Sequence, residues 1–388
     1  MKRNKICYVL PQYFKNSAEN FYHISNFLSE LGKLNDVFLI IENSDTIPGK
    51  IPNIKATHII NPGKKSNLFH RTYKLIELFI KFQKNGVNIF FIRASLTGSL
   101  PIVIYKKFNK SKNVRTIFWS CGQDVVPLSF LPTKKNLKRL TSKFLAKLVF
   151  KHTDFVATGP SLMVDYYANF YSIPKSKIIE LHNDISLNRF CEIDSKAKKV
   201  FKNKLDIANS KIILFVHTFN LARGIDLVPK IALKIKEKKL NIKILCIGRP
   251  GDFSKELEKE IIKHCLSDIV VNIGQVPNRI IQQYYQVSDL FIMPSRGEGF
   301  PRVILESMAC GCPVLTFDVG GIRGILPKGV HNDFVVSIKN EYKFIEKSIE
   351  LINSDKKLND CKKAILDHVD NFETKLIAKK YTEAFSKL

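Results

Sequence analysis

The stretch from Asp289 to Ile325 reads D-L-F-I-M-P-S-R-G-E-G-F-P-R-V-I-L-E-S-M-A-C-G-C-P-V-L-T-F-D-V-G-G-I-R-G-I. Its apolar run Leu290–Met293 predicts a strand, and the residues that follow predict a loop, a helix, a second strand and a glycine turn. Pro301 suits the first helical position, where its missing N–H costs nothing, and Gly311 ends the helix. The order strand, helix, strand is typical of a parallel α/β sheet.

The predicted helix start at Gly299–Arg302 is a potential anion site, because free N–H groups and the positive end of the helix dipole attract negative charge there. Glu298 lies in the loop before the helix and Glu306 lies inside it. Eight helical residues span about 12 Å, which is the scale of a nucleoside diphosphate sugar. One carboxylate can accept hydrogen bonds from ribose hydroxyls and the other from the sugar.

Outside this segment, short apolar runs alternate with amphipathic stretches along the whole chain. The alternation predicts parallel strands with helices on both faces of the sheet. The runs that predict strands are Ile6–Leu10, Val37–Ile41, His58–Ile60, Ile89–Ile92, Thr116–Trp119, Phe155–Ala157, Ile212–Val216, Ile244–Ile247, Val270–Ile273, Leu290–Met293 and Val314–Phe317.

A polar, lysine-rich segment at Cys191–Lys211 interrupts the alternation and marks the region of a domain boundary. We therefore predict an α/β protein of two Rossmann-like, doubly wound domains facing across a cleft. Residues 1–190 form the N-terminal domain, residues 191–370 form the C-terminal domain, and 371–388 form a helix free to pack back on the first. Ligands of such sheets bind outside the carboxyl ends of the strands, so the cleft is the expected site.

The chain is strongly basic, with 62 Lys and Arg against 35 Asp and Glu, a net charge of +27. Such a surface attracts nucleic acid, acidic lipids or phosphorylated small molecules. The eight cysteines are dispersed, without zinc-type spacing, as in a protein of the reducing cytoplasm. The sequence contains no signal peptide and no apolar run near 18 residues, so we expect a cytoplasmic protein with at most peripheral contact to the inner face of the membrane.

The residues around Glu298 and Glu306 resemble the donor-binding signature of glycosyltransferase family 4, whose members are retaining enzymes of the GT-B fold. In that signature a glutamate and a second glutamate enclose seven residues, within the context E-G-F-P and E-x-M-A-x-G-x-P-V. The first part matches Glu298–Pro301 and the second matches Glu306–Val314. The resemblance covers roughly residues 150–330.

The resemblance implies that Glu298 and nearby backbone hold the donor sugar, that Glu306 holds the ribose, and that Arg223 stabilises the leaving diphosphate with the helix start. The family loop carries an Arg and a Lys, and here Thr218 and Arg223 take their places. We assign Glu298 and Arg223 as catalytic. The remaining donor-binding candidates are Gly299, Phe300, Pro301, Arg302, Thr218, Asn220, Gly248 and Val276.

On the acceptor side, the family often carries H-G-x-D at a strand end. The corresponding residues here are Cys121-Gly122-Gln-Asp124, so a cysteine replaces the histidine. We therefore assign Cys121 and Gly122 to the acceptor side and Asp124 to the catalytic residues.

The resemblance predicts a retaining hexosyltransferase that moves a sugar from a nucleotide sugar to a hydroxyl of a lipid-linked or polysaccharide acceptor, in the synthesis of a bacterial surface glycan such as lipopolysaccharide or capsule. UDP is the expected nucleotide because it is the commonest in the family. No cofactor and no metal are expected, since the chain has no D-x-D triplet. One alternative is a sugar-nucleotide epimerase on the same fold. A basic nucleic-acid-binding protein is a weaker alternative, because no nucleic-acid-binding motif occurs.

The segment Lys134–Lys151 holds seven cations and no acid. Leu137, Leu140, Phe144 and Leu148 fall on one helical stripe of this segment. Two interpretations remain open: a core-facing helix with a solvated basic face, or a surface helix that meets anionic lipid.

Overall fold

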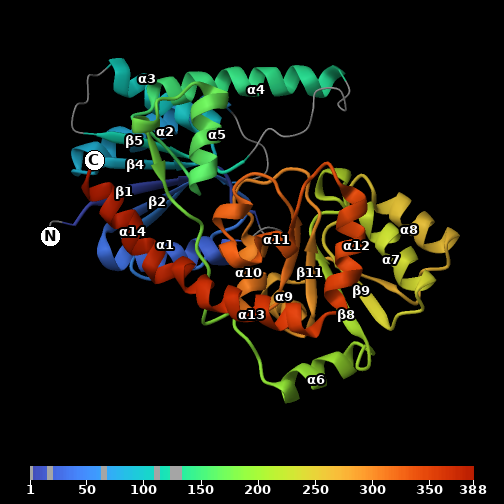
Figure 1. Ribbon diagram of the computed structural model, residues 1–388. Coiled ribbons are helices and arrows are strands. Elements are labelled where there is room, and N and C mark those ends of the chain that lie inside the picture. Colours follow the sequence, from blue (N-terminus) through green and yellow to red (C-terminus); the bar gives the residue numbers. More distant parts are fainter. Residues whose placement is uncertain (1–2, 15–20, 63–67, 109–113, 123–132) are drawn as a thin grey trace. The chain divides into compact units, whose positions relative to one another are not determined.

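The computed structural model describes residues 3–14, 21–62, 68–108, 114–122 and 133–388, and all statements below concern these residues (Figure 1). The chain forms two compact units. One contains the described residues up to Cys121, the stretch that ends at Asp184 and the C-terminal Thr374–Leu388; the other contains Gly122 and Ile185–Glu373.

The described part of the first unit is built on a parallel sheet of seven strands in the order β3-β2-β1-β4-β5-β6-β7. The sequence order reverses between β1 and β4, as in a doubly wound fold. Its strands are continuous apolar runs because both faces of the sheet are covered. They are β1 (Lys5–Leu10), β2 (Asp36–Ser44), β3 (Ala56–Pro62), β4 (Ile89–Arg93), β5 (Arg115–Trp119), β6 (Phe155–Thr158) and β7 (Ile178–Glu180).

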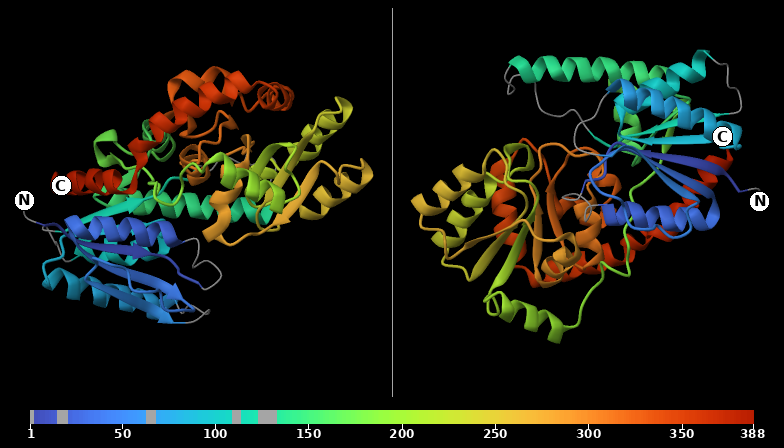
Figure 2. Two further views of the ribbon diagram at one scale, coloured as in Figure 1. Left: turned by 90° about the horizontal axis from the view of Figure 1, so that it is seen from below. Right: turned by 180° about the vertical axis from the view of Figure 1, so that it is seen from behind.

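Helices cover both faces of the first sheet (Figures 1 and 2). On one face, α1 and α14 pack together over a core that includes Tyr8, Leu28 and Tyr381. On the other face, the core includes Phe79 and Phe118. The helices of this unit are α1 (Tyr22–Leu34), α2 (Leu68–Lys84), α3 (Leu96–Phe108), α4 (Thr133–His152), α5 (Ser161–Tyr171) and α14 (Thr374–Ser386).

The second unit repeats this plan with a parallel sheet of six strands in the order β10-β9-β8-β11-β12-β13. Its strands are β8 (Lys211–Val216), β9 (Ile242–Ile247), β10 (Val270–Gly274), β11 (Leu290–Met293), β12 (Val314–Phe317) and β13 (Val335–Val336). Its helices are α6 (Ser195–Lys204), α7 (Leu227–Glu237), α8 (Ser254–Lys263), α9 (Ile281–Val287), α10 (Arg302–Ala309), α11 (His331–Phe334), α12 (Glu341–Ile352) and α13 (Asp355–Val369).

These two sheets confirm the predicted fold class of two Rossmann-like α/β domains. The units divide at Asp184, a few residues before the predicted boundary, and α14 lies in the first unit. The lysine-rich segment Cys191–Lys211 lies inside the second unit. It forms the surface helix α6, capped by the Asp194 carboxylate, which accepts a hydrogen bond from the Ala197 N–H at 2.7 Å. Its polarity therefore reflects a solvated helix.

No helix in the described part of the chain is both long and apolar enough to cross a bilayer.

Candidate functional site

Two loops of the second unit are pressed together where the parallel strands β8 and β11 end. Gly224, in the loop after β8, has a φ of +74°, and a Cβ there would lie 2.1 Å from the Pro294 carbonyl oxygen. The Arg296 N–H also donates to the Ala222 carbonyl oxygen at 2.9 Å. The close approach requires glycine at position 224 and fixes the loop that carries Arg223 against the loop that carries Glu298.

Glu298 is held at this junction by a cation. An Nη1 of Arg223 donates both to the Glu298 carboxylate and to the Gly297 carbonyl oxygen, the latter at 3.0 Å. The Glu298 side chain is only 10% exposed. Burial raises the pKa of Glu298, and Arg223 offsets part of that rise. The site therefore contains a desolvated carboxylate in a fixed orientation.

His217, the residue after β8, faces the same carboxylate. Its Nε2 lies 3.7 Å from Oε1 of Glu298. Burial, together with Arg223 and Arg249, lowers the pKa of His217 to about 3, so the ring is neutral at pH 7. The Thr218 N–H donates to Nδ1 at 2.8 Å, which places the single ring proton on Nε2, on the side of Glu298.

Glu306 lies on α10 and is half-buried. The Tyr285 hydroxyl donates to its Oε2 at 3.2 Å, and Tyr285 itself is fully buried. Burial raises the pKa of Glu306, while Arg302 and Arg189 lower it in part. Glu298 and Glu306 thus share one property: each is a carboxylate whose charge is disfavoured by burial and supported by nearby donors or cations.

The helix that carries Glu306 begins one residue later than predicted. Pro301 is the N-cap of α10, with a ψ of 120°, and Arg302 is the first helical residue. The ring of proline fixes only φ, which suits both positions. Gly299 and Phe300 are buried before the helix, and the Gly321 N–H donates to the Gly299 carbonyl oxygen at 3.0 Å, so the second glycine turn packs on this loop.

This chain is similar to a family model and to several known proteins. The model of the family described as glycosyl transferases group 1 matches residues 197–367, which lie within the second unit. An uncharacterized 41.2 kDa protein in the cps region of Klebsiella pneumoniae is 25% identical over 314 residues, 75% of this chain and 81% of that protein. The N,N'-diacetylbacillosaminyl-diphospho-undecaprenol alpha-1,3-N-acetylgalactosaminyltransferase of Campylobacter jejuni is 26% identical over 264 residues, 66% of each chain. HepE of Anabaena, solved in complex with UDP-glucose, has a TM-score of 0.76 and 15% identity, over 99% of both chains. The chain is a glycosyltransferase of the GT-B fold.

Four further donor-binding candidates of this glycosyltransferase lie in the loops that follow β8, β9 and β10. Asn220 accepts a hydrogen bond from the Arg223 N–H at 3.1 Å and so caps the short turn that carries Arg223. A Cβ at Gly248 would lie 1.7 Å from the His217 carbonyl oxygen, so that loop also requires glycine. Thr218 follows His217 directly. Val276 is half-buried in the loop between β10 and α9.

The acceptor-side candidates of the glycosyltransferase follow β5, and Cys121 belongs to the first unit. The Cys121 thiol donates to the Gly159 carbonyl oxygen at 2.8 Å, and burial raises the pKa of that thiol. Gly122 is exposed. Asp124 lies outside the described residues. The structure thus shows Cys121 as a protonated, hydrogen-bonded thiol, and the roles of all three residues stay predictions.

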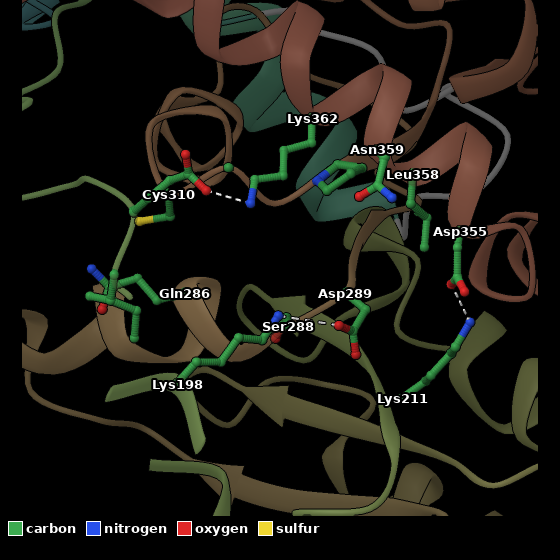
Figure 3. Close-up of a pocket in the computed structure, with 14 residues that line it drawn as sticks. Lys198, Lys211, Gln286, Ser288, Asp289, Cys310, Asp355, Leu358, Asn359 and Lys362 are labelled. Atoms are coloured by element: carbon green, nitrogen blue, oxygen red, sulfur yellow. Dashed lines mark hydrogen bonds and ion pairs between the residues drawn. The ribbon is translucent and has the colours of Figure 1, made fainter. Parts of the chain in front are cut away.

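A cavity of about 290 Å³ lies at the opposite, amino edge of the second sheet (Figure 3). None of the predicted site residues lines it. Its charged side chains form pairs: Lys198 and Asp289 are 3.3 Å apart, and Lys211 and Asp355 are 2.6 Å apart. Because these charges cancel locally, the cavity does not share the electrostatics of the carboxyl edge.

Sequence reasoning did not select His217 and Tyr285 as site residues. His217 belongs to the same loop as Thr218, which offers a local signal. Tyr285 lies 21 positions before its partner Glu306, and only the packing of α9 against α10 brings the two together.

Proposed function

We propose that this glycosyltransferase is a retaining enzyme of the family 4 type that transfers a hexose from a nucleotide sugar, with UDP as the expected nucleotide. The observation that carries the proposal is the pair of partly buried carboxylates, Glu298 and Glu306, on either side of the start of α10. Two hydroxyl-rich parts of one ligand, a ribose and a sugar, match two such acceptors. The likeness to HepE, whose solved structure contains UDP-glucose, supports this donor class.

In the proposed complex, Glu306 accepts hydrogen bonds from the ribose, and Glu298 accepts them from the sugar. The backbone N–H groups before and at Arg302 face the diphosphate. Arg223 uses Nη1 to orient Glu298, and its second terminal nitrogen can bond a phosphate oxygen. Charge developing on the leaving diphosphate is then stabilised by groups that are already in place.

The transfer itself follows the front-face path that the resemblance implies. The bond between the acceptor oxygen and the anomeric carbon forms on the face from which the bond to the diphosphate oxygen breaks. The proton of the acceptor hydroxyl passes to that leaving oxygen, so the configuration is retained. No metal is assigned to this step, and diphosphate stabilisation by N–H groups and Arg223 is proposed in its place.

We propose a lipid-linked or polysaccharide acceptor and a role in bacterial surface glycan synthesis. The Campylobacter relative is named for an undecaprenol-linked acceptor, and the Klebsiella relative for its cps region. A panel of UDP- and GDP-sugars with lipid-linked acceptors tests the proposal by product detection. An Arg223→Ala variant should lose affinity for nucleoside diphosphate far more than for nucleoside. Equal losses for both would show that the guanidinium is not a phosphate clamp.

The epimerase and the transferase make different products. An epimerase converts the nucleotide sugar alone into its epimer, whereas the transferase releases nucleoside diphosphate only when an acceptor is present or by slow hydrolysis. Nucleic-acid binding is tested by filter binding at about 200 mM salt, where non-specific complexes weaken steeply. Retention at that salt would favour the nucleic-acid alternative.

Contact with an anionic membrane is proposed for α4. Its buried face is Ala146, Val149 and Phe150, and Phe144 is 71% exposed. The predicted apolar stripe therefore does not face the core at Phe144. An exposed aromatic ring on a basic helix is suited to a lipid surface, and each cation near anionic lipid contributes about 1 kcal/mol.

Co-sedimentation with anionic and neutral vesicles at two salt levels tests this contact. Binding should require anionic lipid, weaken with salt, and fall when Phe144 becomes Ser, or when Lys134, Lys135, Lys138 and Arg139 become Gln. Equal sedimentation with neutral vesicles would remove α4 as the anchor.

A further inference from the structure

Two side chains with unused donor groups meet at the carboxyl edge of the first sheet. Arg93 is the last residue of β4 and Trp119 the last residue of β5, and the two are paired in the parallel register. The Arg93 guanidinium carbon lies 4.2 Å from the centroid of the Trp119 ring. The stack holds both side chains in place.

Arg93 is a cation with few partners. Its Nη1 donates to the Tyr8 hydroxyl at 3.0 Å, and in the described part of the chain this is the one hydrogen bond that its guanidinium makes, with no carboxylate within 4 Å. A guanidinium carries five N–H donors. Burial opposes the charge of Arg93, but Tyr8, Tyr381 and Asp184 raise its pKa overall. The charge is therefore retained while most of the donors stay unused.

Trp119 carries a second unused donor. The residue is 6% exposed, and its Nε1 makes no hydrogen bond with any described group. Buried polar atoms nearly always have a partner, so an orphaned indole N–H calls for a specific explanation. Arg93 covers a face of the ring, so Trp119 is poorly suited to stack on a sugar, and its N–H is the group it has left to offer.

We propose that Arg93 and Trp119 form an anion subsite in the first unit, which binds the phosphate or carboxylate oxygens of the acceptor. A planar guanidinium binds such groups through two parallel hydrogen bonds, and the indole N–H supplies one more. This inference rests on the proposed function, in which the first unit holds the acceptor. It is distinct from the donor diphosphate, which is assigned to the second unit.

The anion can come from two chemical sources: the diphosphate of a lipid-linked acceptor or the carboxylate of an acidic sugar. Two neighbouring groups bear on the charge of the subsite: the Cys121 thiol and the Asp184 carboxylate, whose charge raises the pKa of Arg93. The Cys121 thiol donates to the Gly159 carbonyl oxygen, and its raised pKa keeps it neutral. The Asp184 carboxylate accepts a hydrogen bond from the Thr374 hydroxyl at 2.8 Å.

The test uses the fact that Trp119 is the only tryptophan of the chain, so its fluorescence reports this subsite. The full-length protein, saturated with UDP, is titrated with farnesyl diphosphate or glucuronate and with the uncharged analogues farnesol and glucose. We expect a saturable emission change with one of the anionic probes, which identifies the source, and no such change with its uncharged analogue.

Variants at Arg93 decide the assignment. Arg93→Gln should weaken the anionic probe by about tenfold or more, the scale of a lost charged hydrogen bond, and Arg93→Lys should recover only part of the loss. Far-UV circular dichroism and UDP affinity should match the wild type in both. Equal response to charged and uncharged probes, or unchanged titration of a folded Arg93→Gln, would overturn the subsite. Failure of the wild type to bind any nucleotide would instead count against the proposed donor site.

Discussion

The two edges of the second sheet carry similar residue types in opposite states. At the carboxyl edge, the Glu298 side chain is 10% exposed and Glu306 is half-buried, and burial raises the pKa of both. At the amino edge, Asp355 is 78% exposed and paired with Lys211. Glu298 and Glu306 are held where their charge is costly, whereas Asp355 is solvated. Charges held in this way are typical of functional sites, and the role of this one stays a prediction.

The largest effect is expected from a substitution that pushes apart the two loops at the carboxyl edge. Gly224→Ala places a Cβ 2.1 Å from the Pro294 carbonyl oxygen at a φ of +74°, so the two loops must separate and donor binding should be lost. Gly274→Ala is the matched control: its φ is +72°, but nothing lies within 4 Å of the new Cβ. Calorimetric titration with UDP compares them. Equal affinity in the two variants would show that the loop contact does not shape the site.

The first sheet also contains a buried acid, Glu42, and the pH dependence of stability measures the effect of its burial. Burial raises the pKa of Glu42 from 4.5 to about 7, against Ser95 and Arg71. A raised folded-state pKa means that the folded state binds more protons between these values, so stability should fall as pH rises from about 4.5 to 7. The fall is roughly 3 kcal/mol at most.

Denaturant unfolding across this pH window checks the prediction for Glu42. Glu42→Gln should flatten the pH dependence, because the amide does not titrate. The exposed residue Glu237 supplies the control, and Glu237→Gln should leave the slope as it is in the wild type. A slope unchanged by Glu42→Gln would assign the dependence to another group.

The Glu306→Ala variant tests whether a carboxylate of the carboxyl edge binds the nucleotide. If Glu306 holds the ribose, the variant should lose roughly 1–3 kcal/mol of nucleotide affinity, the scale of hydrogen bonds to a charged group. Tyr285→Phe removes only the hydroxyl that donates to Glu306 and should cost less. Titration with UDP and GDP measures both. Unchanged affinity in Glu306→Ala, for whichever nucleotide the wild type binds, would exclude the ribose role.

The smallest effect is expected at the amino edge. Asp355→Asn removes the partner of Lys211, but the pair is solvent-exposed, and such pairs contribute about 0–1 kcal/mol. Stability should change within that range, and UDP affinity should stay the same. A clear loss of UDP affinity would show that the cavity in Figure 3 is coupled to the carboxyl edge.

The long apolar runs predicted most strands, because a strand buried on both faces can be recognised from its continuous apolar residues alone. The prediction omitted β7, which is three residues long and only half-buried, and β13, which has two residues. In each case tertiary packing, rather than local pattern, decides the structure.

The sequence selected Glu298, Glu306 and Arg223 for the site, and the structure places Arg223 on Glu298. The resemblance to a known signature supplied these residues, and their roles stay predictions. The contacts that tune the two acids could not be predicted, since His217 and Tyr285 meet them only through neighbouring strands and helices. Likewise, the exposed position of Phe144 depends on which face of α4 packs on the sheet.

Because α14 belongs to the first unit, the two units are completed at different times during synthesis. The ribosome makes Thr374–Ser386 after the second unit, yet Tyr381 and Phe385 are buried in the core cluster of β1 and β4, beside Tyr8 and Phe91. The residues of the second unit, Ile185–Glu373, have all been synthesised before α14. During translation the second unit can therefore complete its core first, while the first unit still lacks α14 and has an apolar face uncovered. That exposed face is a natural point of attachment for a chaperone on the nascent protein.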